Sequence, residues 1–358
     1  MAAQPMTKNS GAPAPSLAAR TFRLDAASLS LRRDALIGLA ALAIAVAVPF
    51  FVTSRYYLGE LAGMFIWMIV ASQWNLLFGV AGVFSLAHLV IFAFGGYATA
   101  MLGFYWGWSF WLAMPAGALL TVGFALVMGI ACLRLTGAYV ALLTLSFGEV
   151  VRQLVITDTE CFIMDGARCV QFAGGATGIT GFVGFNTRAL FRGDYAMADY
   201  YIILTGLVII LLLTYVLMRG PIGLGLRALG NNPGYAVSRG VNRFKFQMVV
   251  FGISAFFTGF AGALYAGRLN SIGPQAMSLE QLLFVIGMVV VGGTGRFWGP
   301  IVGALAMTGI NELMRDFGDF QIIGQGLLLA AVVVLMPSGV VGLFEKLAER
   351  RARSTAGA

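Results

Sequence analysis

Long apolar runs, recurring from residue 34 to residue 337, constrain this chain more than any other feature. A helix needs about 20 apolar residues to cross the hydrocarbon core of a bilayer, and continuous runs favour helices over the alternating pattern of a β-barrel. Only 11% of the residues are charged, whereas soluble domains carry about 25%. Such a chain cannot cover a water-facing surface, so the sequence predicts an all-α, polytopic transmembrane helix bundle.

About ten spans are expected, in two five-helix halves. The expected spans are 34–53, 59–78, 82–104, 108–133, 137–157, 199–218, 246–267, 279–294, 299–314 and 320–337. Two long connections, 158–198 and 219–245, separate the halves within a membrane domain at 34–340. Residues 1–33 lack the apolar core of a signal peptide and are expected to be a mobile cytoplasmic tail, with at most a short surface helix near 24–33. Residues 341–358 are expected to be a second, basic tail.

The net charge of +8 is explained by topology rather than by nucleic-acid binding. With the N-terminus inside, 16 of the 23 Lys and Arg residues fall in cytoplasmic segments, which is the positive-inside bias of helical membrane proteins. Both termini are then cytoplasmic and the loop 219–245 is cytoplasmic too. The loop 158–198 lies outside and contains a Gly-rich stretch, 173–182, that we expect to be flexible.

The loop 219–245 contains the signature of a helix break. Asn232 suits the N-cap of a helix and Pro233 suits its first position, while the residue before a proline is disfavoured in a helix, so the preceding helix should end by Asn231. The sequence predicts a short helix at 233–241, ended near Gly240. A helix of this length is unstable alone in water, so it must pack against its own bundle or a partner. The alternative is an ordinary cytoplasmic connector.

Several polar residues lie within the expected spans. Glu149 and Arg152 are three residues apart and share one helix face; charges in a membrane are costly and usually face the bundle interior or a water-filled path. They form either a polar part of a solute path or a structural ion pair near the end of the span. His88, the single histidine, with Ser85 and Asn75 nearby, either lines such a path or hydrogen-bonds between helices.

The expected outer ends of two spans carry further groups. The aromatic stretch 104–111 is typical of an interfacial belt. Asn311, Glu312 and Arg315 close the ninth span, where they line its outer mouth or sit at the interface.

Three cysteines raise the question of a disulfide. Cys132 lies within a span and is expected to be inert packing. Cys161 and Cys169 lie eight residues apart in the outer loop, where an oxidising compartment permits a bridge if their Cα atoms are close enough. A disulfide and two free thiols both remain open.

Five ordered stretches resemble the integral membrane permeases of high-affinity branched-chain amino acid ABC importers. They are WNLLFGVAGVFSLAHLVIFAFGGYATAML (74–102), RLTGAYVALLTLSFGEVVRQ (134–153), GGATGITG (174–181), the segment 226–266 and VVVGGTGRFWGPIVGA (289–304). The resemblance covers roughly 60–345. Family loops often carry acidic residues where this chain reads LGNNPGYA at 229–236.

The resemblance implies the permease subunit of an ATP-driven importer for branched-chain or related small amino acids in a bacterial inner membrane. Expected partners are two cytoplasmic ATPase subunits, a second homologous permease chain, a periplasmic solute-binding protein and the lipid bilayer, with no nucleic acid. The short helix at 233–241 would be the element that couples to the ATPases. Its candidate residues are Arg227, Asn231, Asn232, Pro233, Arg239 and Gly240.

The phosphate-binding motif Gly-x-x-x-x-Gly-Lys-Ser/Thr does not occur in the sequence. We therefore expect no ATP binding, no cofactor and no catalytic residue on this chain, and do not expect an enzyme. Because the family also carries urea, short amides and other small carboxylates, these solutes remain alternatives. A nucleotide-independent channel or carrier, with Glu149 and Arg152 as a coupling site, and a membrane scaffold are the rival classes.

Overall fold

The computed structural model describes residues 17–52, 54–135, 137–165, 168–187 and 195–315, with isolated residues between 318 and 343. The side chains of 17–31 and 164–169 are outside this description. The chain divides into two compact units, Met1–Thr53 and Ser54–Ala358, which are taken in turn.

The first unit contains one long helix, α1 (Leu17–Phe51). Its Arg32–Phe51 part is long and apolar enough to cross a membrane, close to the expected span. The helix begins at Leu17, however, so residues 17–33 are helical where a mobile tail was expected. This stretch contains no glycine or proline and is rich in Ala, Leu and Arg, which favour helix.

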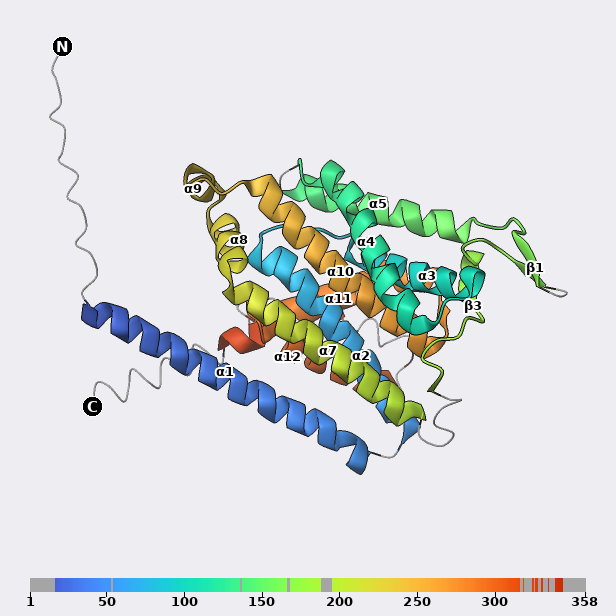
Figure 1. Cartoon of the computed structure of the whole chain (residues 1–358), viewed down its shortest axis with the longest axis horizontal. Coiled ribbons are helices and arrows are strands. Elements are labelled where there is room, and N and C mark those ends of the chain that lie inside the picture. The colour runs from blue at the N-terminus through green and yellow to red at the C-terminus, as the bar shows by residue number, and fades with distance from the viewer. Residues whose placement is uncertain are drawn as a thin grey trace, which may run out of the picture. The chain divides into compact units, whose positions relative to one another are not determined.

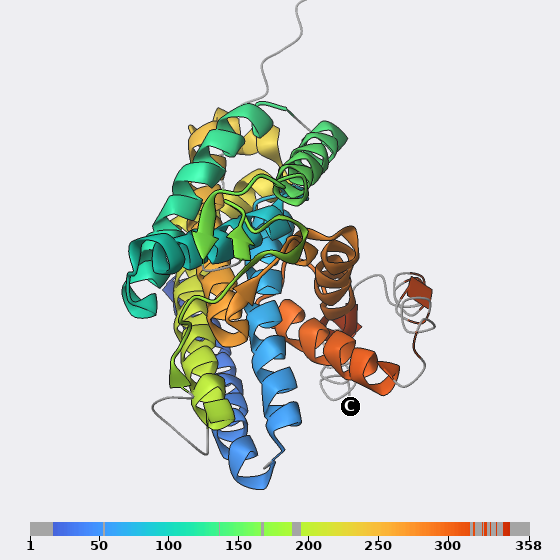
Figure 2. The same ribbon diagram turned by 90° about the vertical axis from the view of Figure 1, so that its right-hand side faces the viewer.

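The second unit is a helix bundle (Figures 1 and 2). Its longer helices are α2 (Arg55–Asn75), continued by the π-helical turn η1 (Leu76–Val80), α3 (His88–Trp106), α4 (Phe110–Cys132), α5 (Ala138–Ile156), α7 (Tyr195–Arg219) and α10 (Arg243–Leu269). Helix α10 packs against α3, α4 and α2, and α2 also packs against α7. Helices α2 and α10 therefore form the centre of the bundle.

The number of ten spans is not confirmed. Seven helices among the described residues are long and apolar enough to cross a membrane. The expected eighth and ninth spans are α11 (Leu279–Gly292) and α12 (Gly299–Leu313), of 14 and 15 residues. At 1.5 Å per residue each is about 22 Å long, less than the roughly 30 Å hydrocarbon core. The tenth expected span, 320–337, lies almost entirely outside the described residues. The fold is that of an all-α, polytopic membrane protein.

The expected third span, 82–104, begins too early. Residues 81–87 are not helical, and α3 starts at His88. Gly82 adopts a left-handed conformation (φ 69°), which breaks the helical path after η1. Most of this loop is nevertheless buried. An apolar run reports burial rather than helical backbone, so hydropathy could not reveal the loop.

Residues elsewhere in the bundle form hydrogen bonds with backbone groups of this buried loop. The Trp74 indole donates a hydrogen bond to the Ser85 carbonyl (2.8 Å), and the Leu86 N–H donates to Thr144 Oγ1 of α5 (2.9 Å). Non-helical backbone at membrane depth is tolerated where protein groups pair with it. The loop is thus an ordered, hydrogen-bonded part of the core.

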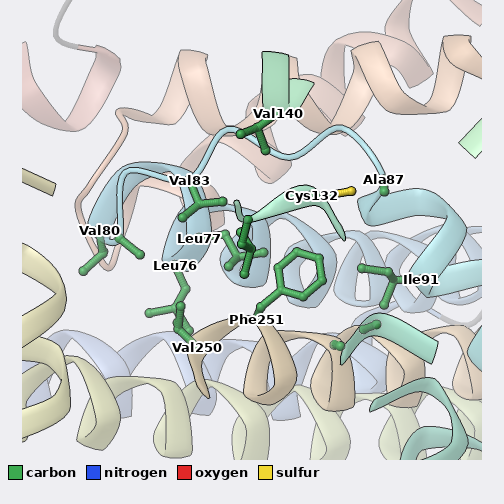
Figure 3. Packing of buried hydrophobic residues seen from close by; sticks show 14 of the residues in the cluster. Leu76, Leu77, Val80, Val83, Ala87, Ile91, Cys132, Val140, Val250 and Phe251 are labelled. Atoms are coloured by element: carbon green, nitrogen blue, oxygen red, sulfur yellow. The ribbon is translucent and has the colours of Figure 1, made fainter. Parts of the chain in front are cut away.

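An apolar cluster surrounds the loop (Figure 3). It joins residues of η1, the loop itself, and helices α3, α4, α5 and α10. Cys132 is a free, buried member of this cluster, as expected for inert packing. The cluster holds η1 and the loop against α10.

Short strands and 3-10 turns cap the end of the bundle at which α5 and α10 end. They are β1 (Ile163–Asp165) paired antiparallel with β2 (Arg168–Val170), η2 (Gly175–Thr177), β3 (Ile179–Thr180) paired antiparallel with β4 (Ser271–Ile272), and η3 (Pro274–Met277). Gly178 has a φ of 77°, and a Cβ there would collide with the Ile272 carbonyl. The Gly-rich stretch expected to be flexible is therefore closely packed, because its glycines allow backbone to meet backbone.

Candidate functional site

Two short helices form the connection between α7 and α10: α8 (Pro221–Asn231) and α9 (Pro233–Ser238). Asn232 is extended (φ −149°) and its side chain accepts a hydrogen bond from the Tyr235 N–H at 3.1 Å. This confirms the predicted break and N-cap. Helix α9 has six residues rather than the nine expected, and Gly240 follows it in a left-handed conformation (φ 87°).

Helix α9 and its C-cap residue Arg239 form an exposed, basic surface together with Arg227 of α8. Ala236 is buried, whereas the other α9 residues are exposed. The Arg239 guanidinium donates to the Tyr235 hydroxyl (2.9 Å) and lies over the same ring. Arg227 and Arg239 are exposed, and the sequence contains no acidic residue from 200 to 279. A surface of this kind favours an acidic partner.

Helix α8 rests directly on the buried loop. It buries Gly223, Leu226 and Leu229 on one face. At its last turn Gly230 meets η1 so closely that an added Cβ would lie 2.6 Å from the Val80 carbonyl oxygen. The basic helix pair is therefore joined to the bundle core by backbone contact.

Asn75, an expected solute-path residue, clamps another loop. Its Oδ1 accepts a hydrogen bond from the Gly295 N–H (2.8 Å), and its Nδ2 donates to the Arg296 carbonyl (2.9 Å). Residues 293–298 connect α11 to α12. The Asn75 amide thus ties this connection to the end of α2.

His88 hydrogen-bonds between helices. Its side chain is fully buried, and Nε2 lies 2.8 Å from Thr258 Oγ1 on α10. Ser85 is also buried. The interhelical interpretation describes His88 as it stands, whereas the Ser85 hydroxyl has no hydrogen-bond partner among the described residues. A place on the solute path stays a prediction for both.

Glu149 and Arg152 form an ion pair within α5, as one of the two interpretations proposed. The Arg152 Nη2 to Glu149 Oε1 distance is 2.9 Å, and Gln153 donates to the same oxygen at 2.8 Å. The Glu149 side chain is 48% exposed and the Arg152 side chain is 28% exposed. The pair therefore lies on the outside of this chain rather than among its core helices.

A buried polar group of four residues was missed by sequence reasoning. Gln73 Nε2 of α2 donates to Thr214 Oγ1 of α7 (2.8 Å), and Ser254 Oγ of α10 donates to the backbone carbonyl of Gln73 (3.2 Å). Thr258 lies one turn beyond Ser254. A glutamine in the middle of an apolar run was the available signal, but its partners lie more than 140 residues away.

A second polar contact joins the start of α2 to the end of α12. The Tyr56 hydroxyl donates to Glu312 (3.0 Å), and the Arg315 guanidinium pairs with Glu312 (3.7 Å) and lies over the Tyr56 ring. Two of the three residues predicted for this end, Glu312 and Arg315, thus hold two helices together. Asn311 lies on the same helix.

The loop with the two cysteines contains the β1–β2 hairpin. Cys161 is disulfide-bonded. The pairing with Cys169 stays a prediction, because the side chain of Cys169 is outside the description. Across the described residues, no group of three His, Cys, Asp or Glu side chains is arranged to hold a metal ion.

A small cavity lies near the α8–α9 end, lined by residues of the loop 81–87, the α4–α5 turn, Arg243 and Gln247. Its volume is about 100 Å³, below the roughly 300–1,000 Å³ of ligand pockets. It is too small to hold an amino acid.

These features define a polytopic membrane protein with a packed helical core and a basic, exposed helix pair at one end. Residues 56–337 match the family of branched-chain amino acid transport system permease components. The chain belongs to this family.

Two relatives cover most of the chain. It is 30% identical over 342 residues to the high-affinity branched-chain amino acid transport system permease protein LivM of Salmonella typhimurium and, equally, to LivM of Escherichia coli; each comparison covers 89% of this chain and 78% of the relative. The ribose import permease protein RbsC of Haemophilus influenzae is 33% identical over 129 residues, 34% of this chain and 40% of that protein. No solved structure matches the chain. The predicted resemblance is confirmed: the chain is a LivM-like permease, a transport subunit rather than an enzyme.

Proposed function

We propose that the chain is the permease subunit of an ATP-driven importer that moves branched-chain or related small amino acids across a bacterial inner membrane. The similarity to LivM along 89% of the chain carries this proposal. The ribose permease matches only 34% of the chain, which favours an amino acid over a sugar. Urea, short amides and other small carboxylates remain the alternative solutes.

The α8–α9 pair is the proposed docking surface for two ATPase subunits. A helix that buries only Ala236 of its own residues gains stability from a partner. Motion of such a partner would reach the core through Gly230 and η1 as a rigid-body shift of packed elements. The positive-inside bias supports a cytoplasmic location for this end and for both termini.

The opposite end, with β1 to β4, is the proposed docking side for a solute-binding protein. A second, homologous permease would cover part of the exposed helix surface. The Glu149–Arg152 pair supports the presence of a second permease, because a partly exposed ion pair that faced lipid would be costly.

Reconstitution in liposomes tests the function. The chain, a second permease, the ATPases and the binding protein should give leucine uptake with ATP and none with a non-hydrolysable analogue. Replacing residues 233–238 by a Gly-Ser linker should abolish uptake, while the complex between this chain and the second permease should stay intact. Uptake that proceeds without any ATPase would instead identify a channel or carrier.

A further inference from the structure

Helix α2 has one face that is left partly open in an otherwise buried helix. Gly59, Gly63 and Trp67 recur every fourth residue and are partly exposed, whereas Ala62, Met64, Phe65 and Ile66 are buried. Residues four apart lie on the same side of a helix. Helix α10 packs along α2, and so do α11 and α12 (Figure 2).

Arg268, in the last turn of α10, lies against this open face. Its Nη2 is 2.9 Å from the position a Cβ would take on Gly59, and its Nη1 is 3.2 Å from the corresponding position on Gly63. The guanidinium therefore lies alongside the second and third turns of α2 instead of extending past the helix end. The two glycines leave the space that it fills.

Arg268 differs from other arginines of the bundle. Arg152, Arg239 and Arg315 each contact a carboxylate or a tyrosine hydroxyl or ring. Within the described part of the chain the Arg268 guanidinium makes no hydrogen bond or ion pair; Glu60 and Asp199 act on it only through longer-range attraction. A sheltered guanidinium with open donor positions is costly unless it has another partner.

Three aromatic rings lie about one helical turn further into the bundle than this cation. Tyr265 precedes Arg268 by one turn of α10, and its ring centroid is 6.3 Å from that of Trp67. Phe284 of α11 is 6.5 Å from Trp67. Trp67, Tyr265 and Phe284 are all partly exposed. The planar cation thus lies nearer the β-strand end of the bundle, and the aromatic rings follow it one helical turn further in.

We propose that Arg268 binds the carboxylate of the amino-acid solute and that Trp67, Tyr265 and Phe284 contact the solute's apolar side chain. This inference rests on the proposed function. A guanidinium presents two parallel N–H donors that match a carboxylate, and its position two turns inside α2 lets a solute meet it soon after entering from the β-strand end. The aromatic surface beyond it suits a branched aliphatic chain.

Transport per ATP hydrolysed is the appropriate measurement, at saturating loaded binding protein, in the complete importer in liposomes. Arg268→Met keeps most of the side-chain length and removes the donors. It should lower leucine transport per ATP by about 10- to 100-fold, the ratio that corresponds to losing charge-assisted hydrogen bonds. ATP hydrolysis stimulated by the loaded binding protein should persist, which shows that the complex is assembled. Arg268→Lys, which keeps the charge but not the fork, should fall between.

Arg55→Met is the matched control. Arg55 is an exposed cation at the same end of α2 and lies over the Tyr195 ring, and its replacement should leave transport per ATP unchanged. If Arg268→Met does not assemble, Arg268→Lys decides: reduced transport per ATP supports the proposal, and wild-type coupling overturns it. Wild-type coupling in Arg268→Met, or an equal loss in Arg55→Met, also overturns it. A wild-type importer without ATP-driven leucine uptake would contradict the proposed function itself.

Discussion

Gly82 and Gly230 meet backbone to backbone: a Cβ on Gly82 would lie 3.1 Å from the Gly230 Cα atom. Gly82 belongs to the buried loop before α3, and Gly230 lies in the last turn of helix α8. The contact places the proposed ATPase-docking surface directly on a loop whose next helix begins with His88. Force applied to α8 and α9 therefore has a short path to the centre of the bundle.

Gly230→Ala should disturb this contact. The added methyl would meet the Val80 carbonyl, and overpacking typically costs about 1–3 kcal/mol. We expect a lower thermal unfolding temperature and less leucine transported per ATP. Gly123→Ala is the control, since a Cβ at Gly123 has no heavy atom within 4 Å among its described surroundings. Equal unfolding temperatures and equal transport per ATP in the two variants would show that the contact tolerates an added methyl group.

Asn75→Ala should loosen the connection between α11 and α12. The substitution removes two hydrogen bonds to residues 295 and 296 and leaves their backbone groups unpaired, at about 1–3 kcal/mol. Thermal unfolding of the purified chain in detergent measures this loss. Ser109→Ala, at an N-cap whose side chain makes no capping bond, should change stability little.

Thr258→Val should destabilise the α3–α10 contact. The substitution keeps the shape of the side chain but leaves the buried His88 Nε2 without its 2.8 Å partner, and an unsatisfied buried group costs about 1–3 kcal/mol. Thr205→Val is the matched change, because Thr205 is exposed and bonds only its own helix, at the Tyr201 carbonyl. A shift no larger than that of the control would argue against a structural role for the His88 bond.

Arg239→Glu should weaken ATPase binding. With no acid on this chain from 200 to 279, the complementary charges must come from the partner, and reversing one of the cations creates repulsion. Co-purification across a salt series should show weaker binding, most clearly at low ionic strength. Arg134→Glu reverses another exposed cation, in the turn between α4 and α5, and should bind as the wild type does. Salt-independent binding of both variants would rule out an electrostatic interface.

A maleimide mass-shift assay should test the Cys161–Cys169 bridge. We expect neither residue to react before reduction, whereas Cys169→Ala should make Cys161 reactive at once. A bridge that closes so short a loop should stabilise it by about 2–3 kcal/mol, which limited proteolysis before and after reduction would detect. Alkylation of both residues without reductant would exclude the pairing.

Local features were predictable and contacts were not. The Asn232–Pro233 break followed from capping chemistry, which involves neighbours in sequence. Residues 82–87 fall within the expected span 82–104, because the apolar residues of a buried loop and of a buried helix cannot be told apart in the sequence. In the sequence, Arg268 is only a charge just beyond the expected span 246–267. The glycines at 59 and 63 were a signal, but the helix that fills the space beside them lies some 200 residues further along the chain.

The sequence by itself determined the class of protein, the approximate positions of most long helices, the break before α9 and the family. These depend on hydropathy, on local backbone preferences and on ordered motifs, all of which are written along the chain. Tertiary structure alone decided that Asn75 clamps residues 293–298, that α8 rests on η1, and that Arg268 lies over Gly59 and Gly63. Each of these depends on which helices pack together, and in an apolar bundle many helix faces are chemically alike until backbone contacts at glycine and a few buried hydrogen bonds select one arrangement.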